Sequence, residues 1–234
     1  MRCCPVFFCF RREPLTENQM TTETFIFFMD CIGSIAFAIS GAVLAIRKNM
    51  DIFGVCILAV VTATGGGVIR DILMGKLPPV MFTDPTYVIL ALVAAVGIFL
   101  FFKVRKSRNL VIPAKAVEVY TGILFWFDTV GLAAFTVDGV YAGFSTPENN
   151  LFLSIFVGVI TGVGGGLLRD IFADEMPAIF VKHVYAVASI AGAFATGFFL
   201  RFGNDPHLAL LIGFAVTVLI RYLAAHFRWN LPRV

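Results

Sequence analysis

The segment Thr62-Ala-Thr-Gly-Gly-Gly-Val-Ile-Arg-Asp-Ile72 decides the fold, because it returns 99 residues later as Thr161-Gly-Val-Gly-Gly-Gly-Leu-Leu-Arg-Asp-Ile171. A proline follows each copy, at Pro78 and Pro177. Chance similarity between two apolar segments would not keep three glycines, an Arg-Asp pair and a proline in the same order. The chain therefore contains two copies of one structural unit.

The repeat extends into the apolar segment that precedes each motif. At an offset of 98, five residues of the first half return in the second half: Asp30, Gly33, Ala36, Phe37 and Gly41 correspond to Asp128, Gly131, Ala134, Phe135 and Gly139. The unit is thus longer than one motif and covers several consecutive apolar segments.

The composition is that of a membrane protein. Apolar residues make up 59% and charged residues 14% of the 234 residues, whereas soluble domains carry about 25% charge. A helix needs about 20 mostly apolar residues to cross the hydrocarbon of a bilayer, and the segments lack the alternation of barrel strands. The sequence predicts an all-α membrane protein with seven transmembrane helices: Phe25–Ile46, Ile52–Met74, Tyr87–Phe102, Val119–Tyr141, Leu151–Ala173, Val184–Leu200 and Leu208–Ala225.

The repeat divides the chain into two three-helix units followed by one further helix. We expect residues 1–24 to be a disordered extension, with translation beginning naturally at Met20, residues 25–112 to be the first unit and 113–203 the second. Residues 204–234 form the seventh helix and a tail. Because each unit has an odd number of spans, the second enters the membrane from the opposite side, and the repeats are predicted to be inverted.

The basic residues of the loops predict the orientation of the chain. Five lie on the side of the N-terminus and ten on the other side, leaving out Arg70, Arg169 and Arg221, which fall within or at the edge of spans. Basic residues favour the cytoplasmic side. We expect a multi-pass protein of the cell inner membrane with its N-terminus outside and its C-terminus in the cytoplasm.

Two triplets of glycine lie inside predicted spans two and five. Each glycine costs a helix about 1 kcal/mol relative to alanine, and three in a row leave the backbone open to bending. Paired interrupted helices at corresponding places of two repeats point to a path for an ion or solute. The alternative is close helix packing, which a ladder of small residues also favours. The candidate path residues are Gly65, Gly66, Gly67, Gly164, Gly165 and Gly166.

Charged residues lie within or near the same spans. Arg70 and Arg169 follow the triplets by one helical turn, and an arginine in a membrane is costly unless it meets water or a carboxylate. The candidate carboxylates are Asp71, Asp170, Asp30, Asp128 and Asp138. Five carboxylates against two guanidiniums leave an acidic excess of three, which favours a cation as the permeant species. These residues also fit structural ion pairs that hold helices together, or an interfacial position.

Other chemistries find little support in the sequence. The histidines lie far apart, and no nucleophile, base and orienting group form a recognisable catalytic motif. The five cysteines have no metal-ligand spacing. We therefore expect no enzymatic activity, no catalytic residue, no metal site, no cofactor and no nucleic-acid partner.

From Met20 onward the chain resembles the prokaryotic branch of the trimeric intracellular cation channel (TRIC) family, on the evidence of the duplicated Gly-Gly-Gly-x-x-Arg-Asp and the prolines behind it. The resemblance implies a homotrimer in membrane lipid, with one pore in each seven-span protomer. It implies that spans two and five line the pore, that the two motifs supply the functional residues, and that potassium or other monovalent cations pass. Animal members carry a lysine behind the second triplet and bind phosphoinositide there. Leu167 follows Gly166 here, so that property does not transfer.

A second interpretation of the same features is a secondary transporter of a small solute such as glycine. Inverted repeats with interrupted helices are typical of transporters, and a zwitterion suits a site that contains both arginine and aspartate. The sequence leaves both classes open.

Overall fold

The computed structural model describes residues 17–107, 115–147, 150–181, 184–203, 205–227 and 229, and within these every regular element is an α-helix. Seven of the helices are long: α1 (Glu17–Arg47), α2 (Ile52–Leu73), α4 (Thr86–Ser107), α5 (Lys115–Phe144), α6 (Leu151–Phe172), α8 (Tyr185–Arg201) and α9 (Pro206–His226). Two are single turns, α3 (Val80–Thr83) and α7 (Ala178–Val181). Six long helices have the length and apolarity to cross a membrane, and α8 is apolar but only 17 residues long.

The helices extend beyond the apolar windows that predicted them. Helix α1 begins at Glu17, so residues 17–24 are helical and their assignment to a disordered extension is wrong. Residues 1–16 lie outside the described part of the chain. Helix α4 continues to Ser107 and α5 begins at Lys115. A helix satisfies its own backbone hydrogen bonds whatever its side chains are, so polar residues prolong it past the hydrophobic stretch.

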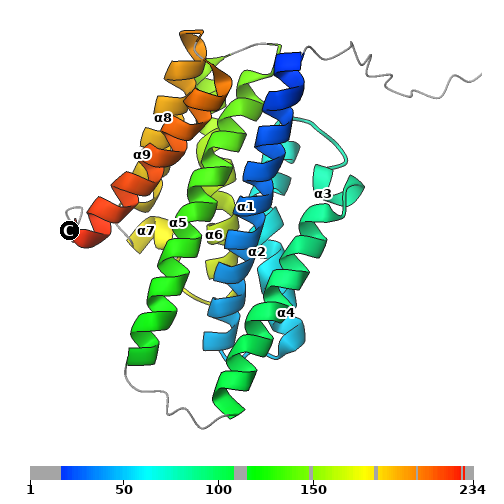
Figure 1. Cartoon of the computed structure of the whole chain (residues 1–234), viewed down its shortest axis with the longest axis vertical. Coiled ribbons are helices and arrows are strands. Elements are labelled where there is room, and N and C mark those ends of the chain that lie inside the picture. Colours follow the sequence, from blue (N-terminus) through cyan, green and yellow to red (C-terminus); the bar gives the residue numbers. More distant parts are fainter. Residues whose placement is uncertain are drawn as a thin grey trace, which may run out of the picture.

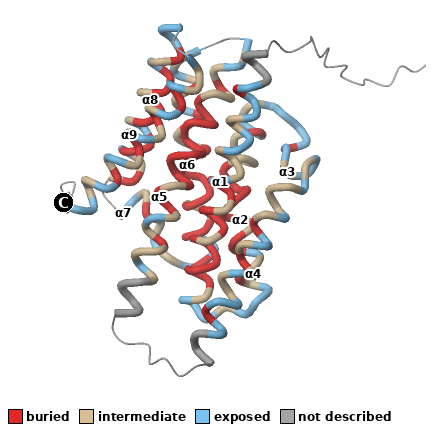
Figure 2. The backbone as a smooth tube through the Cα atoms, viewed as in Figure 1, coloured by how far each residue is buried: buried red, intermediate tan, exposed pale blue. Residues whose placement is uncertain are grey.

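The long helices run side by side along the longest axis of the molecule, with α8 and α9 on one side and α4 on the other (Figure 1). The buried residues gather on the central helices α1, α2, α5 and α6 (Figure 2). Many are small, such as the fully buried Ala38, Ala42 and Ala133, and small residues let helix backbones approach closely in a membrane. Large apolar side chains such as Phe53, Phe152 and Phe180 are exposed, as expected where lipid or another subunit covers the surface.

The two motif helices begin and end alike. The side chain of Asp51 caps α2 by accepting from Gly54 N at 2.7 Å, and Asn150 caps α6 by accepting from Phe152 N at 2.9 Å. Beyond the C-termini, Gly75 and Asp174 both adopt positive φ, at 68° and 52°. This left-handed residue ends each helix at the same distance past its Arg-Asp pair.

The glycine triplets do not interrupt their helices. Both α2 and α6 are continuous through the triplets, so the predicted helix breaks are wrong. The glycines instead allow the two helices to cross closely. A Cβ at Gly66 would strike the carbonyl oxygen of Thr161, and a Cβ at Gly165 would strike that of Thr62. Packing at this crossing offsets the low helix propensity of glycine, as the alternative interpretation of the triplets predicted.

Candidate functional site: a buried charge network

Arg169 of α6 lies at the centre of one group of buried charges. Its side chain is almost fully buried, and its Nε and Nη2 atoms both lie 2.8 Å from Asp170 Oδ1. Its Nη1 atom donates to Asp128 Oδ1 at 2.6 Å and to Ser40 Oγ at 2.5 Å. Residues of α1, α5 and α6 thus meet at one guanidinium, which satisfies the requirement that an arginine in a membrane be paired.

Arg70 of α2 forms the corresponding group in the first half. Its Nε donates to Asp71 Oδ1 at 2.9 Å, and its Nη1 donates to Asp138 Oδ2 of α5. The side chain of Arg70 is 13% exposed, compared with 2% for that of Arg169. Both arginines therefore have the carboxylate partners predicted for them. Arg70, in the first half, is the more accessible of the two arginines.

The aspartates of the two motifs also hold the chain that follows them. Asp71 Oδ2 accepts from the backbone of Val80 at 2.9 Å, and Asp170 Oδ2 accepts from that of Ala178 at 2.8 Å. These two amides belong to the first residues of α3 and α7. Each Arg-Asp pair is thus tied to the loop that leads into the next long helix.

A third arginine, Arg221 of α9, belongs to the network, and the sequence-based selection did not include it. Its Nη2 lies 3.2 Å from Asp128 Oδ2, and its Nε lies 3.4 Å from Thr129 Oγ1. Its guanidinium carbon lies 4.7 Å from the ring centre of Tyr185 and 4.9 Å from that of Phe125. Five carboxylates and three guanidiniums leave an acidic excess of two, so the predicted excess of three is wrong. Arg221 lies outside the repeat, so the repeat does not point to it. The sequence could still have indicated it, because an arginine inside an apolar helix is costly unless it is paired.

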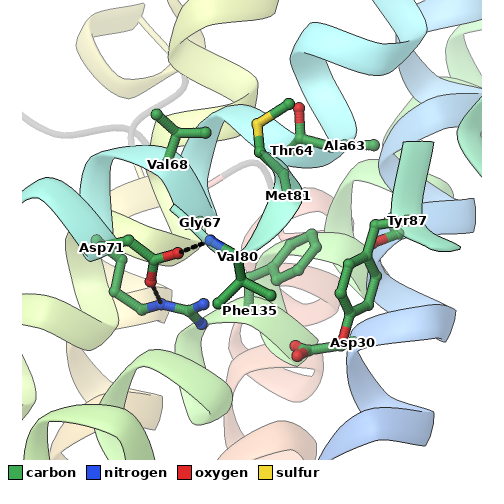
Figure 3. Close-up of a pocket in the computed structure, with 12 residues that line it drawn as sticks. Asp30, Ala63, Thr64, Gly67, Val68, Asp71, Val80, Met81, Tyr87 and Phe135 are labelled. Carbon is green, nitrogen blue, oxygen red and sulfur yellow. Dashed lines mark hydrogen bonds and ion pairs between the residues drawn. The ribbon is translucent and has the colours of Figure 1, made fainter. Parts of the chain in front are cut away.

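A cavity of about 50 Å³ lies among the helices of the first half, with Phe135 of α5 also on its wall. Its lining includes Arg70. Asp30, Asp71 and Tyr87 also line it, and the close-up labels these three (Figure 3). Asp30 Oδ1 is buried and has no hydrogen-bond partner within the described residues. The volume exceeds the roughly 10–15 Å³ that a water molecule requires.

Some glycines of the two triplets lie at the crossing of α2 and α6, and others lie beside the charged residues. Gly65 faces the side chain of Leu168, whereas Gly164 faces the backbone of Gly66. Gly67 lines the cavity, while a Cβ at Gly166 would lie 2.6 Å from the hydroxyl of Tyr185. The triplets are therefore mainly packing elements, and only Gly67 among them borders the cavity.

This arrangement can attract and hold positive charge. Over the part of the chain that the structure describes, no three His, Cys, Asp or Glu side chains are placed to hold a metal ion. The buried excess is instead spread over ion pairs between helices. The fold and the network define a helical membrane protein with charged groups buried at the contact between its two halves.

Comparison with known proteins identifies the family. The family model described as "Glycine transporter" matches residues 27–103 and again residues 125–201, so it covers each half once. The UPF0126 inner membrane protein YadS of Escherichia coli K12 is 38% identical over 209 residues, which are 88% of this chain and 95% of YadS.

Solved structures agree with this result. The TRIC channel orthologue from Rhodobacter sphaeroides is 34% identical, with a TM-score of 0.77 over 88% of this chain and 100% of that chain. A prokaryotic TRIC channel crystallised in 0.5 M KCl is 31% identical, with a TM-score of 0.79 over 89% of this chain and 100% of that chain. The chain belongs to the trimeric intracellular cation channel family.

Proposed function

We propose that the protein is a channel for monovalent cations, potassium among them, with one path through each protomer. The observation that carries this proposal is the acidic excess buried between the two halves, in a chain that shares 34% identity with a TRIC channel. A fixed negative charge at membrane depth lowers the energy of a cation and raises that of an anion.

In this proposal the seven long helices all span the membrane, and the two three-helix halves are inverted. The crossing of α2 and α6 supports the inversion, since Gly66 meets Thr161 and Gly165 meets Thr62. Such reciprocal contacts are those that a two-fold axis produces. The N-terminus lies outside and the C-terminus in the cytoplasm, because the basic loop residues favour that orientation. Three protomers assemble in the inner membrane, as the description of the Rhodobacter sphaeroides relative as trimeric supports.

The path passes the charge groups of both halves. Arg70 and Arg169 control it through their charge, and the five carboxylates Asp30, Asp71, Asp128, Asp138 and Asp170 attract the ion. The cavity beside Asp30 and Gly67 supports an entry on the side of the first half, because Arg70 is the more exposed of the two motif arginines.

The alternative is a carrier for a small solute such as glycine, which the description of the family model favours. Single-channel recording of the purified protein in planar bilayers separates the two. A channel gives discrete unitary currents, and its reversal potential under a potassium chloride gradient lies near that of a cation. Saturable uptake of labelled glycine into liposomes, without unitary currents, would show a carrier instead. Liposomes without protein serve as the control for leak.

A further inference from the structure

The second half contains a buried arginine beside its aspartate, and no described residue of the first half corresponds to it. There, the guanidinium of Arg221 lies against Asp128 and between the rings of Phe125 and Tyr185. Counting back 98 residues from these three gives Asp30, Phe27 and Tyr87. The rings of Phe27 and Tyr87 lie 6.2 Å apart. The first half therefore has an acid and two aromatic rings at the corresponding positions.

No described side chain takes the place of Arg221 in the first half. Asp30 Oδ1 is buried without a hydrogen-bond partner in the described part of the chain, although a buried oxygen normally has one. The cavity of about 50 Å³ lies beside it, with Tyr87 on its wall (Figure 3). An unpartnered carboxylate oxygen next to a cavity is the arrangement that a bound cation would complete.

The balance of charge also differs between the two halves, because the group in the first half is more acidic than the group in the second half. Ser40 and Asp138 occupy corresponding positions, 98 residues apart. Ser40 accepts a hydrogen bond from Arg169, whereas the charged Asp138 accepts one from Arg70. The second group is neutral, with two carboxylates and two guanidiniums: Asp128, Asp170, Arg169 and Arg221. The first group has three carboxyl groups and one guanidinium, a formal charge of −2 when every carboxyl group is ionised: Asp30, Asp71, Asp138 and Arg70.

We propose that the cavity beside Asp30 binds one small monovalent cation, and that Arg221 is its covalently attached counterpart in the second half. The Asp30 carboxylate and water would coordinate the ion, and Tyr87 would offer its ring. A divalent ion fits less well, because in the described residues no three acidic, histidine or cysteine side chains are placed to hold a metal ion together. This inference deepens the proposed function, since it places one binding site for the permeant class of ion.

Thermal unfolding of the purified protein in detergent tests the site without measuring flux. Potassium chloride replaces N-methyl-D-glucamine chloride at constant ionic strength. A cation that binds only the folded protein raises the Tm in step with the logarithm of its concentration, once that concentration exceeds the dissociation constant. We expect this rise in the parent protein and its loss in Asp30→Asn. That variant should fold, because Asp30 Oδ1 makes no hydrogen bond to a described residue.

Two further variants control the experiment. Tyr87→Leu removes the aromatic ring from the cavity wall and should raise the potassium concentration at which the Tm begins to rise, by about tenfold if the ring contributes ~1.4 kcal/mol. Asp174→Asn removes the same charge from an exposed position where φ is 52°, a conformation that asparagine tolerates as well as aspartate. It should respond to potassium as the parent does.

Three results would overturn the proposal. The first is a Tm of the parent that does not depend on potassium. The second is an equal response in Asp30→Asn. The third is a response to low magnesium or to pH alone, which would show a divalent ion or a proton in the cavity. A protein that conducts cations but shows no potassium-dependent Tm would refute this site and leave the proposed channel function intact. Potassium binding without current would support the site and refute the channel function.

Discussion

Gly66 of α2 lies against the carbonyl oxygen of Thr161 in α6, so closely that a methyl group at Gly66 has no space. The same contact occurs between Gly165 and Thr62 on the other side of the crossing. These contacts join the two halves of the molecule at the level of their repeated motifs. Side chains that separated the backbones would also move the charge groups that follow each triplet.

Alanine at Gly66 should therefore lower the stability of the protein. Overpacking of a core costs about 1–3 kcal/mol, and the neighbour here is backbone, which cannot rotate away. Gly67→Ala is the matched control on the same helix, because its Cβ would meet only Arg70 Nη2 at 3.9 Å. The Tm in detergent should fall for Gly66→Ala and stay level or rise for Gly67→Ala. Equal Tm values for the two variants would contradict the close crossing.

Leucine at Gly66 or Gly165 is expected to prevent correct packing of α2 on α6. Flux would be lost, but the yield of folded protein would fall with it. This differs from the expectation for a glycine-lined path, where a bulky side chain would block flux in a protein that still folds. Size-exclusion profiles of the purified variants distinguish the two explanations.

Glutamine at the two motif arginines should affect different properties. Arg169→Gln leaves Asp170 and Asp128 with less compensation in a buried site, and breaking such a pair costs about 3–5 kcal/mol. Arg221 remains beside Asp128, which limits any gain of free negative charge there. Arg70 is more exposed, and no second arginine lies beside its aspartate partners. Arg70→Gln should therefore increase cation selectivity with a smaller loss of Tm. Reversal potentials and Tm values of both variants, compared with the parent, check this difference.

Arg221 and Asp128 should be energetically coupled. Arg221→Gln removes one of two guanidiniums from Asp128 and empties the space between two aromatic rings. Asp128→Asn leaves both arginines underpaired. Contacting charged residues typically show a coupling energy of about 0.5–3 kcal/mol, so the double variant should be more stable than the sum of the single effects predicts. Additive losses of unfolding free energy would show that the contact contributes nothing to stability.

The protein should purify as a homotrimer in mild detergent. The family membership leads to this expectation, and exposed phenylalanines such as Phe194 and Phe198 offer apolar surface for contacts between protomers as well as for lipid. Native mass measurement should give three times the protomer mass of 25.6 kDa, apart from bound detergent and lipid. An active monomer would contradict the prediction.

The sequence by itself determined the helical membrane class, the duplication and the pairing of the motif arginines with carboxylates. Each follows from a local or additive property. Apolar content sets the solvent, the repeated Gly-Gly-Gly-x-x-Arg-Asp shows the duplication, and the cost of a bare guanidinium in a membrane requires an acidic partner. For the same reason the structure brings the motif arginines together with the candidate aspartates Asp71, Asp128, Asp138 and Asp170.

Only the tertiary structure decided what the glycines and the third arginine do. Continuity of α2 and α6 depends on the packing energy gained where they cross, and that energy comes from residues about 100 positions apart in the sequence, such as Gly66 and Thr161. Arg221 lies outside the repeat, so no spacing within the motif indicates which aspartate it neutralises. The unequal charge of the two halves, and the open cavity beside Asp30, depend on where α9 packs. It packs against α5 and α8 in the second half, and no described helix of the first half corresponds to it.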